Sequence, residues 1–188
     1  MNPPDGGTGG LTWPDVPPAA GRVRLREFRN ADLAMVLDLA TDPYVPRIST
    51  LPAGAGEQDA LAYIARQHGR LSEGRGFSFC VALAADDTAV GTAGLWVDDL
   101  SHGRFRGGYT VAPSHRGQGL ATDALRALTS FAWTLDVAHR VELYVEPWNT
   151  ASLGVAERAG YEREGLLRGH HLIGGEWCDM LLLAALRP

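Results

Sequence analysis

The chain contains no lysine, since each of its 17 basic residues is an arginine. This absence excludes a lysine Schiff base, and with it ordinary pyridoxal-phosphate chemistry. It also excludes a standard P-loop, whose lysine contacts the bound phosphates. Cysteine is nearly as scarce, because the 188 residues include only Cys80 and Cys178. Both lie in apolar runs without metal-ligand spacing, which predicts two buried thiols in a reducing cytoplasm and no metal site.

Long apolar runs and an excess of positive charge are also missing. No run approaches the roughly 20 apolar residues of a transmembrane helix, so we expect no membrane partner. The formal net charge of −5 argues against a nucleic-acid partner. Residues 1–20 hold Gly and Pro pairs and lack the basic start and apolar centre of a signal peptide. We therefore expect residues 1–20 to be a flexible tail outside the fold and residues 21–188 to form one cytoplasmic domain.

The spacing of apolar residues predicts alternating groups of strands and helices. Period-two patterns predict strands and 3.6-residue periods predict helices. Strands are expected at residues 22–29, 77–84, 89–97, 104–111, 140–146, 161–171 and 177–185. Helices are expected at residues 30–40, 57–72, 120–135 and 149–159, with a loop at residues 44–56. The resulting order, β-α-α-β-β-β-α-β-α-β-β, shows no internal repeat.

The most informative stretch runs from Tyr109 to Thr122 and reads as a strand, a turn marked by Pro113, two glycines and an amphipathic helix. The first N–H groups of a helix have no partner within it, and the helix dipole favours an anion there. Gly117 and Gly119 also remove side chains that would block close approach to the backbone. The stretch therefore predicts a phosphate-binding site.

The residues Arg116-Gly-Gln-Gly-Leu-Ala121 match the Q/R-x-x-G-x-G/A signature of the GNAT acyl-CoA-dependent N-acetyltransferases. Two later matches are Asn149-Thr-Ala-Ser152 and a Gly-aromatic-x-x-Glu-Gly pattern at residues 160–165. Together they resemble the branch that contains the ribosomal-protein alanine N-acetyltransferases. The resemblance covers about residues 22–186. It implies an α+β fold with α/β/α layers, in which about seven strands form a mixed, mostly antiparallel twisted sheet flanked by about four helices.

The same resemblance implies acetyl-CoA as cosubstrate and no metal. Backbone N–H groups of the glycine turn would bind the pyrophosphate, and the strand through Thr110 and Val111 would pair with the pantetheine amides. A backbone donor near Val111 would stabilise the reaction's oxyanion. Asn149 would contact the pantetheine arm while also acting as a helix N-cap. The implied cofactor-binding residues are Thr110, Val111, Arg116, Gly117, Gln118, Gly119, Leu120, Ala121, Thr122 and Asn149.

Ser152 is the candidate for assisting departure of the CoA thiolate. Many GNAT enzymes carry a tyrosine four residues before the glycine of the Gly-aromatic pair, but here that position is Ala156. The ribosomal-protein branch uses the serine of Asn-x-x-Ser instead. Because a serine hydroxyl is a poor acid, we expect a hydrogen bond to the departing sulfur rather than full proton transfer. The competing interpretation is a serine that bonds locally in the first turn of a helix.

The general base that takes the proton of the acceptor amine has two candidates. Glu142 and Glu146 share a strand face with Tyr144, and Glu146 lies nearest the strand end. His171 follows Glu164-Gly165, about where the ribosomal branch carries an acidic residue, and its ordinary pKa suits base catalysis near neutrality. Glu146 and His171 rank equally on the sequence.

The sequence thus predicts direct transfer of acetyl to a primary amine of a protein N-terminus or a small molecule. One alternative is a non-catalytic acyl-CoA-binding or sensor domain, which the alanine at position 156 keeps open. Another is a dinucleotide-dependent oxidoreductase, because Gly117-x-Gly119-x-x-Thr122 resembles part of a Rossmann fingerprint. The acceptor is open between ribosomal protein N-termini, free amino acids, polyamines and aminoglycoside-like compounds. The oligomeric state is also open, with a homodimer as one candidate.

Overall fold

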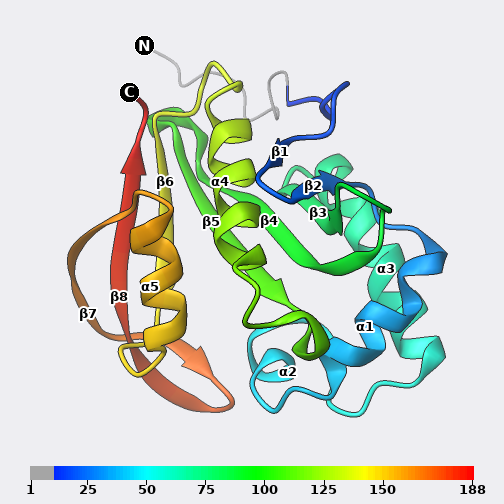
Figure 1. Cartoon of the computed structure of the whole chain (residues 1–188). Coiled ribbons are helices and arrows are strands. Elements are labelled where there is room, and N and C mark those ends of the chain that lie inside the picture. Colours follow the sequence, from blue (N-terminus) through cyan, green and yellow to red (C-terminus); the bar gives the residue numbers. More distant parts are fainter. Residues whose placement is uncertain (1–10) are drawn as a thin grey trace.

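The computed structural model describes residues 11–188, and its strands form one sheet in the order β1-β2-β3-β4-β5-β6-β8-β7 (Figure 1). The strands are β1 (Ala19–Ala20), β2 (Val23–Arg26), β3 (Gly76–Leu83), β4 (Ala89–Asp99), β5 (Arg104–Val111), β6 (Arg140–Val145), β7 (Glu162–Ile173) and β8 (Glu176–Leu186). Neighbouring strands are antiparallel except β5 and β6, which are parallel. The predicted mixed, mostly antiparallel sheet is confirmed. The doubly wound parallel sheet of a Rossmann fold is incompatible with this order.

The helices of the described residues are α1 (Leu33–Ala40), α2 (Val45–Ile48), α3 (Glu57–Ser72), α4 (Leu120–Ala132) and α5 (Thr150–Arg158). Short 3-10 turns lie at η1 (Asn30–Asp32), η2 (Leu100–His102) and η3 (Pro113–His115). Four helices match the predicted ones. The fifth, α2, lies inside the predicted loop, where Pro46 occupies the first turn and so removes no intrahelical hydrogen bond. The longest of these helices, α3, has 16 residues, and none meets the requirements of a membrane span.

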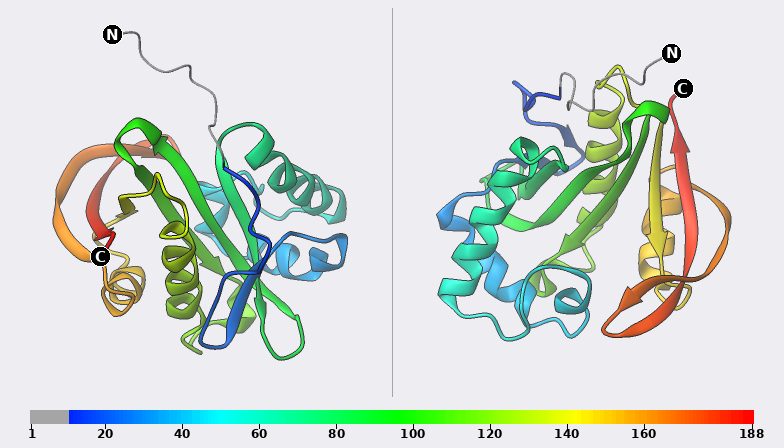
Figure 2. Two further views of the ribbon diagram at one scale, coloured as in Figure 1. Left: turned by 90° about the horizontal axis from the view of Figure 1, so that it is seen from above. Right: turned by 180° about the vertical axis from the view of Figure 1, so that it is seen from behind.

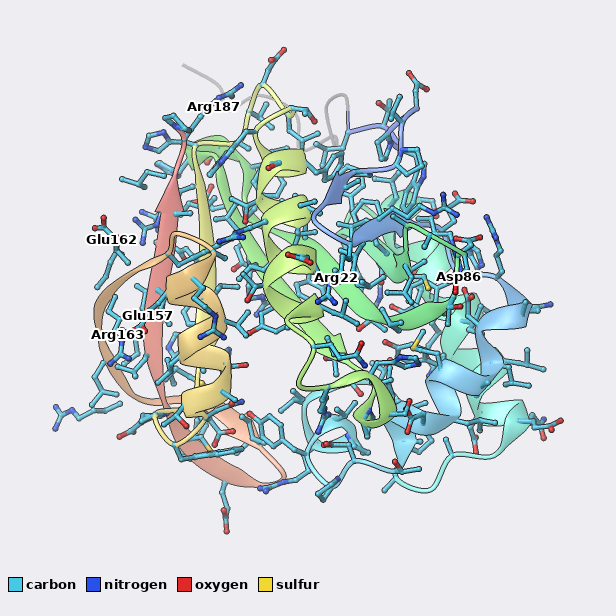
Figure 3. All side chains as sticks on the ribbon, viewed as in Figure 1. Arg22, Asp86, Glu157, Glu162, Arg163 and Arg187 are labelled. Atoms are coloured by element: carbon cyan, nitrogen blue, oxygen red, sulfur yellow. The ribbon has the colours of Figure 1, made fainter. Side chains whose placement is uncertain are left out.

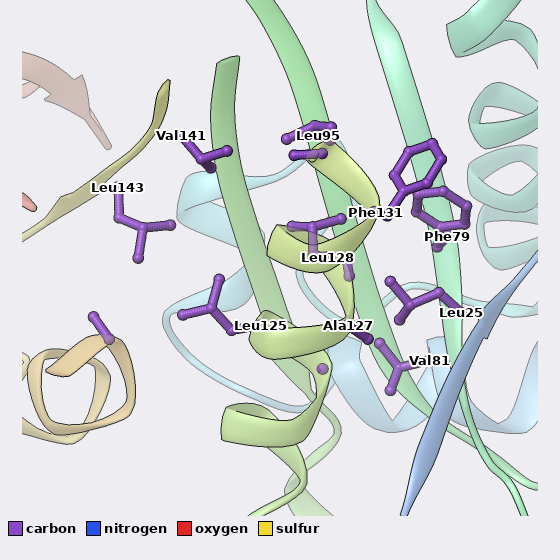
Figure 4. Packing of buried hydrophobic residues seen from close by; sticks show 14 of the residues in the cluster. Leu25, Phe79, Val81, Leu95, Leu125, Ala127, Leu128, Phe131, Val141 and Leu143 are labelled. Carbon is purple, nitrogen blue, oxygen red and sulfur yellow. The ribbon is translucent and has the colours of Figure 1, made fainter. Parts of the chain in front are cut away.

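The helices cover the two faces of the sheet, with α4 and α5 on one side and α1 and α3 on the other (Figure 2). β3 is buried from both sides, and its residues alternate between two clusters. Phe79 and Val81 pack with Leu125 and Leu128 of α4 (Figure 4), whereas Cys80 belongs to the cluster beneath α1 and α3. The apolar stripe of α4 therefore fixes the start of this helix against the sheet.

The N-terminal segment corrects one prediction. The sequence places residues 1–20 outside the fold, but β1 pairs with β2 and Leu11 and Trp13 pack against the main core. The Trp13 ring lies 4.7 Å from the Phe79 ring, measured between centroids. Residues 11–20 are therefore part of the fold, because one large apolar ring outweighs the surrounding prolines and polar residues. Residues 1–10 lie outside the described residues.

The parallel strands β5 and β6 diverge along their length (Figure 1). Their pairing runs from Arg104 opposite Arg140 to Arg106 opposite Glu142. β5 then continues to Val111 beside β4. The N–H of Ala112 donates to Val90 of the β4 side, and N–H groups alternate along a strand. The N–H of Val111 therefore faces away from β4, toward the space between the diverging strands.

Candidate functional site

The glycine turn connects β5 to α4 in the arrangement that the sequence predicts. Gly117 and Gly119 have φ angles of +75° and +79°, and Gly119 is the N-cap of α4. A Cβ added at Gly117 would meet no atom of residues 11–188 within 4 Å, so this glycine is needed for its backbone angle and not for lack of space. The first turn of a 13-residue helix opens directly behind these glycines, as an anion site requires.

Two arginine side chains stabilise the glycine turn by donating hydrogen bonds to backbone carbonyls. The Arg116 side chain donates from Nε to the Val111 carbonyl at 3.0 Å and contacts Asp42 Oδ2 through Nη1 at 2.7 Å. The Arg22 guanidinium donates to the Gln118 carbonyl, and Figure 3 shows Arg22 beside α4. The positive charge of Arg116, one of the residues expected to bind the cofactor, is thus shared with Asp42. Its two contacts show that Arg116 also fixes the shape of the turn.

Asp42 joins the glycine turn to the segment before α2. Its Oδ1 accepts hydrogen bonds from the backbone N–H groups of Tyr44 and Val45, at 2.7 and 2.9 Å. Burial raises the pKa of Asp42, but the hydrogen bonds from Val45, Arg116 and Tyr44 outweigh it and hold the pKa below its ordinary value. The carboxylate therefore stays charged at neutral pH and ties two walls of the site together.

The turn opens into a cleft of about 660 Å³ between the diverging strands. Ser152 and every residue predicted to bind the cofactor line this cleft. The latter are Thr110, Val111, Arg116, Gly117, Gln118, Gly119, Leu120, Ala121, Thr122 and Asn149. The structure thus brings together residues that are up to 42 positions apart in the sequence (110 to 152).

Asn149 and Ser152 lie at the start of α5, on the wall opposite the glycine turn. Asn149 Oδ1 accepts the N–H of Ser152 at 3.1 Å, so the N-cap interpretation of Asn149 holds. A cofactor contact of Asn149 would use its Nδ2 group, which is a separate donor. The Ser152 hydroxyl accepts a hydrogen bond from Tyr109 at 3.1 Å.

Glu146 lies behind the cleft at the end of β6, and its side chain is buried. Its carboxylate accepts a hydrogen bond from the Tyr44 hydroxyl, and the Tyr44 ring meets the Trp148 ring edge-on at 5.1 Å. Burial raises the pKa of Glu146, but hydrogen bonds from Tyr44, Trp148 and Cys178 offset this and lower the pKa below its ordinary value. Tyr44 and Trp148 both line the cleft. Glu146 is therefore a charged group that lies directly behind two side chains of the cleft wall, Tyr44 and Trp148.

A family model described as an acetyltransferase (GNAT) domain matches residues 22–162. The chain belongs to the GNAT acetyltransferase family. N-acetyltransferase p20 of Bacillus licheniformis is 26% identical over 166 residues, which cover 88% of this acetyltransferase and 93% of the relative. The ribosomal protein uS5-alanine N-acetyltransferase of Escherichia coli is 28% identical, over 71% of this chain and 68% of its own.

Solved structures agree with this assignment. RimJ of Mycobacterium smegmatis, in complex with CoA-disulfide, superposes with a TM-score of 0.73 and is 26% identical. The match covers 90% of this acetyltransferase and 88% of RimJ. A relative named as a ribosomal-protein alanine N-acetyltransferase and the structure of RimJ are thus among its matches, which confirms the resemblance inferred from the motifs. The activity of the family, N-acetyl transfer, is the activity of this chain.

His171, the second base candidate of the acetyltransferase, lies apart from the cleft lining. His171 lies on β7, and its ring meets the Tyr144 ring edge-on, with 5.4 Å between the centroids. The His170 ring lies 4.9 Å from the His171 ring, also between centroids. Burial, with the nearby His170 and Arg106 charges, lowers the pKa of His171 below its ordinary 6.5. The β7–β8 register shifts between Leu167 and His171, and both histidines contact the Tyr144 ring. Gly169, whose φ is +55°, lies within this irregular stretch, and a glycine inside a strand is its signal in the sequence.

Sequence reasoning missed several residues of the acetyltransferase site. Asp42, Tyr44, Tyr109 and Arg158 line the cleft but belong to no recognised motif. The signal available for Tyr109 was its place on the strand that leads into the glycine turn. Cys178, expected to be buried, is half-exposed, and burial with the neighbouring Glu146 raises its pKa. Both cysteines are free thiols, as the sequence predicts.

Proposed function

We propose that the chain transfers acetyl from acetyl-CoA to a primary amine in a ternary complex, with the cleft as the shared site. The observation that carries the proposal is the meeting of three features in one cleft: the glycine turn at the start of α4, the outward N–H of Val111, and Ser152 on α5. The open space at Gly117 lets a phosphate approach the backbone closely. The residues present therefore fit a CoA ester.

Each wall of the cleft has its own role in this proposal. N–H groups of residues 117–121 hold the pyrophosphate, because those of Arg116 and Thr122 already donate to the carbonyls of Pro113 and Gly119. The free edge of β5 at Thr110 and Val111 receives the pantetheine amides as an added strand would. Bound acetyl-CoA supplies an activated thioester. The Val111 N–H then donates to the thioester oxygen as negative charge develops on it. Asn149 Nδ2 orients the pantetheine arm, and Ser152 donates a hydrogen bond to the departing sulfur.

The acceptor amine enters from the side of Tyr44 and Trp148. An amine arrives mainly as its ammonium form and must lose a proton before attack. Glu146 is charged at neutral pH and contacts both a cleft-lining tyrosine and the cleft-lining Trp148. We propose that Glu146 accepts the proton of the acceptor amine, directly or through one water, and keep His171 as the second candidate for this role. A protein N-terminal alanine is the first acceptor to test, because the Escherichia coli relative is named for that reaction.

Binding is tested by melting the protein with and without acetyl-CoA. A ligand present at 100 times its dissociation constant stabilises the folded state by about 2.7 kcal/mol. For a chain of this size, that corresponds to a rise in melting temperature of roughly 5–10 °C. An unchanged melting temperature, with no heat in calorimetry at saturating acetyl-CoA, would overturn the proposal.

Turnover is tested by CoA release with a panel of amines that includes an alanine-initiated peptide, spermidine and free amino acids. Ser152→Ala separates an enzyme from a binding module. In an enzyme this variant keeps its affinity for acetyl-CoA and loses most of its turnover. A wild type that binds acetyl-CoA but releases no CoA with any of these amines would favour the binding module.

A further inference from the structure

Tyr109 and Ser152 form a pair of hydroxyl groups across the cleft wall. Tyr109 comes from β5, two residues before Val111, and Ser152 comes from the first turn of α5. The Tyr109 hydroxyl donates to Ser152 Oγ at 3.1 Å and lies 3.4 Å from the Ser152 carbonyl oxygen. The Tyr109 ring is held by the main core, and both residues line the cleft.

Ser152 is therefore fixed from two directions. Asn149 Oδ1 holds its backbone N–H, and Tyr109 occupies one lone pair of its hydroxyl. A serine hydroxyl has one proton and two lone pairs. When Tyr109 donates to a lone pair, the Ser152 proton must point away from Tyr109 and is free to donate into the cleft. A hydroxyl that accepts one hydrogen bond is also a stronger donor in the next.

Position 156 makes this pair significant. Alanine has no hydroxyl, and Ala156 is fully buried, so this position of α5 supplies no proton donor. Tyr109 brings a phenol to the cleft from the facing strand. Burial raises the pKa of Tyr109 above its ordinary 10, more than the hydrogen bond with Ser152 lowers it, so the phenol keeps its proton at neutral pH. Its proton is thus available for the hydrogen bond to Ser152 Oγ, the nearer of its two acceptors.

We propose that Tyr109 is a positioning residue for thiolate departure, acting through Ser152. This inference rests on the proposed function. In the transfer, the acceptor nitrogen bonds to the acetyl carbon, the carbon–sulfur bond breaks, and its electron pair stays on sulfur. The amine proton leaves through Glu146 or water, and Ser152 stabilises the thiolate by a hydrogen bond that Tyr109 orients. Tyr109 keeps its proton throughout, and no oxidant or further reactant is needed.

The test compares Tyr109→Phe with Tyr161→Phe. Tyr161 is a matched control, because it is also a buried tyrosine in a hydroxyl pair, 2.7 Å from Thr129 Oγ1, but it does not line the cleft. In steady-state assays, Tyr109→Phe should lower kcat roughly tenfold, as loss of one hydrogen bond allows, with an unchanged KM for acetyl-CoA. Tyr161→Phe should leave both constants unchanged.

A second measurement needs no acceptor. Calorimetry between pH 7 and pH 9 compares CoA with desulfo-CoA, which lacks the thiol. If Ser152 stabilises the thiolate, CoA gains affinity over desulfo-CoA as the pH rises toward the pKa of the CoA thiol. Tyr109→Phe and Ser152→Ala should each reduce this gain, by up to tenfold, and the double variant should lose no more than Ser152→Ala alone.

The outcomes separate the two proposals. A wild type that fails to bind CoA overturns the proposed function. If CoA binds and Tyr109→Phe behaves like the wild type in both measurements, the inference about Tyr109 is wrong while the proposed function stands. If Tyr109→Phe still lowers kcat and the thiol-dependent gain in the Ser152→Ala background, Tyr109 does not act through Ser152 and the inference is also overturned.

Discussion

At the scale of single residues, the glycines of the cofactor turn are required by backbone angle. Gly117 and Gly119 both have positive φ, a region that residues with a Cβ enter only at a cost. In the described part of the chain, a Cβ at Gly119 would have only the Arg22 guanidinium nearby, at 3.6 Å, and one at Gly117 would meet no atom within 4 Å. Space is available at both positions, so any penalty for alanine comes from strain.

We therefore expect Gly117→Ala and Gly119→Ala each to lower the free energy of unfolding by about 1–2 kcal/mol. Both should also weaken acetyl-CoA binding, since the N–H groups that face the phosphate would turn away. Gly165→Ala is the control, because Gly165 has no positive φ and open space around it. Urea unfolding measures the stability and calorimetry the affinity. An equal loss in Gly165→Ala would show that backbone strain is not the cause.

Glu146 and His171 differ in the pH range over which their side chains change protonation. The lowered pKa of Glu146 keeps its carboxylate ionised throughout the neutral range, whereas His171 loses its basic form only as the pH falls below about 6.5. We expect Glu146→Gln to have a kcat roughly a hundredfold below that of the wild type at every pH between 6 and 8. His171→Gln should have little effect on kcat in this range. A wild-type kcat that falls between pH 7 and pH 5.5, with this fall abolished in His171→Gln, would instead assign the base to His171.

The residues proposed to bind the cofactor belong to short local motifs, and the structure places them along one cleft. The glycine turn predicts an anion site by itself, whereas Asn149 and Ser152 are recognised through their resemblance to the family's Asn-x-x-Ser motif. Tyr44 and Tyr109 are not, because each meets its partner across the cleft, 102 and 43 positions away in the chain. Contacts of this kind depend on the divergence of β5 and β6, which no periodicity encodes.

At the scale of secondary-structure elements, the turn between β3 and β4 is held by an acidic residue. Asp87 has a positive φ and accepts hydrogen bonds from Arg24, Arg26 and Arg29. Arg26 is buried and also pairs with Asp32 at 2.8 Å. The sequence predicts both the turn and the alternation of β2, but not that β2 places its arginines over this turn. The cluster links β2 to the turn at one end of the sheet, and its residues do not line the cleft.

Asp87→Asn keeps the backbone angle, which asparagine tolerates, and removes the charge. We expect it to lower the free energy of unfolding at pH 7 by about 1–3 kcal/mol. Burial raises the pKa of Asp87, but its hydrogen bonds with Arg26, Arg24 and Arg29 lower it well below the ordinary 3.8. The contribution is therefore complete above about pH 4 and is lost as the pH falls further, so the wild type and the variant should converge in acid.

Asp86→Asn is the control for this experiment. Asp86 is the exposed neighbour of Asp87 (Figure 3) and accepts one local hydrogen bond, from the Thr88 N–H at 3.0 Å. Its replacement should have the smaller effect in urea unfolding at pH 7. A difference between Asp87→Asn and the wild type that persists unchanged at pH 2 would contradict a charge-based role.

At the scale of the whole molecule, the sheet consists of two parts joined at the short β5–β6 pairing. The sequence gives the order of elements and hence the fold family, since a meander followed by the glycine turn and a second strand–helix unit has few solutions. It does not give the extent of the parallel pairing, which ends at Arg106 and Glu142 and so creates the cleft.

The N-terminal segment completes the core of the first part, although its composition predicts a tail. Trp13 packs on Phe79 and Phe77, whose rings also meet Phe131 of α4. Trp13→Ala removes a large apolar contact from this cluster. We expect it to lower the free energy of unfolding by about 2 kcal/mol, from lost apolar burial and ring–ring contact.

Trp177→Ala is the matched control for Trp13→Ala, because the Trp177 side chain is 70% exposed on the β7–β8 hairpin. It should stay within about 0.5 kcal/mol of the wild type, as surface substitutions do. Neither tryptophan lines the cleft, so both variants should keep their affinity for acetyl-CoA. Urea unfolding with and without acetyl-CoA measures both quantities. Equal stability of the two variants would mean that residues 11–20 add nothing to the core, whereas a selective loss in Trp13→Ala extends the folded unit to this segment.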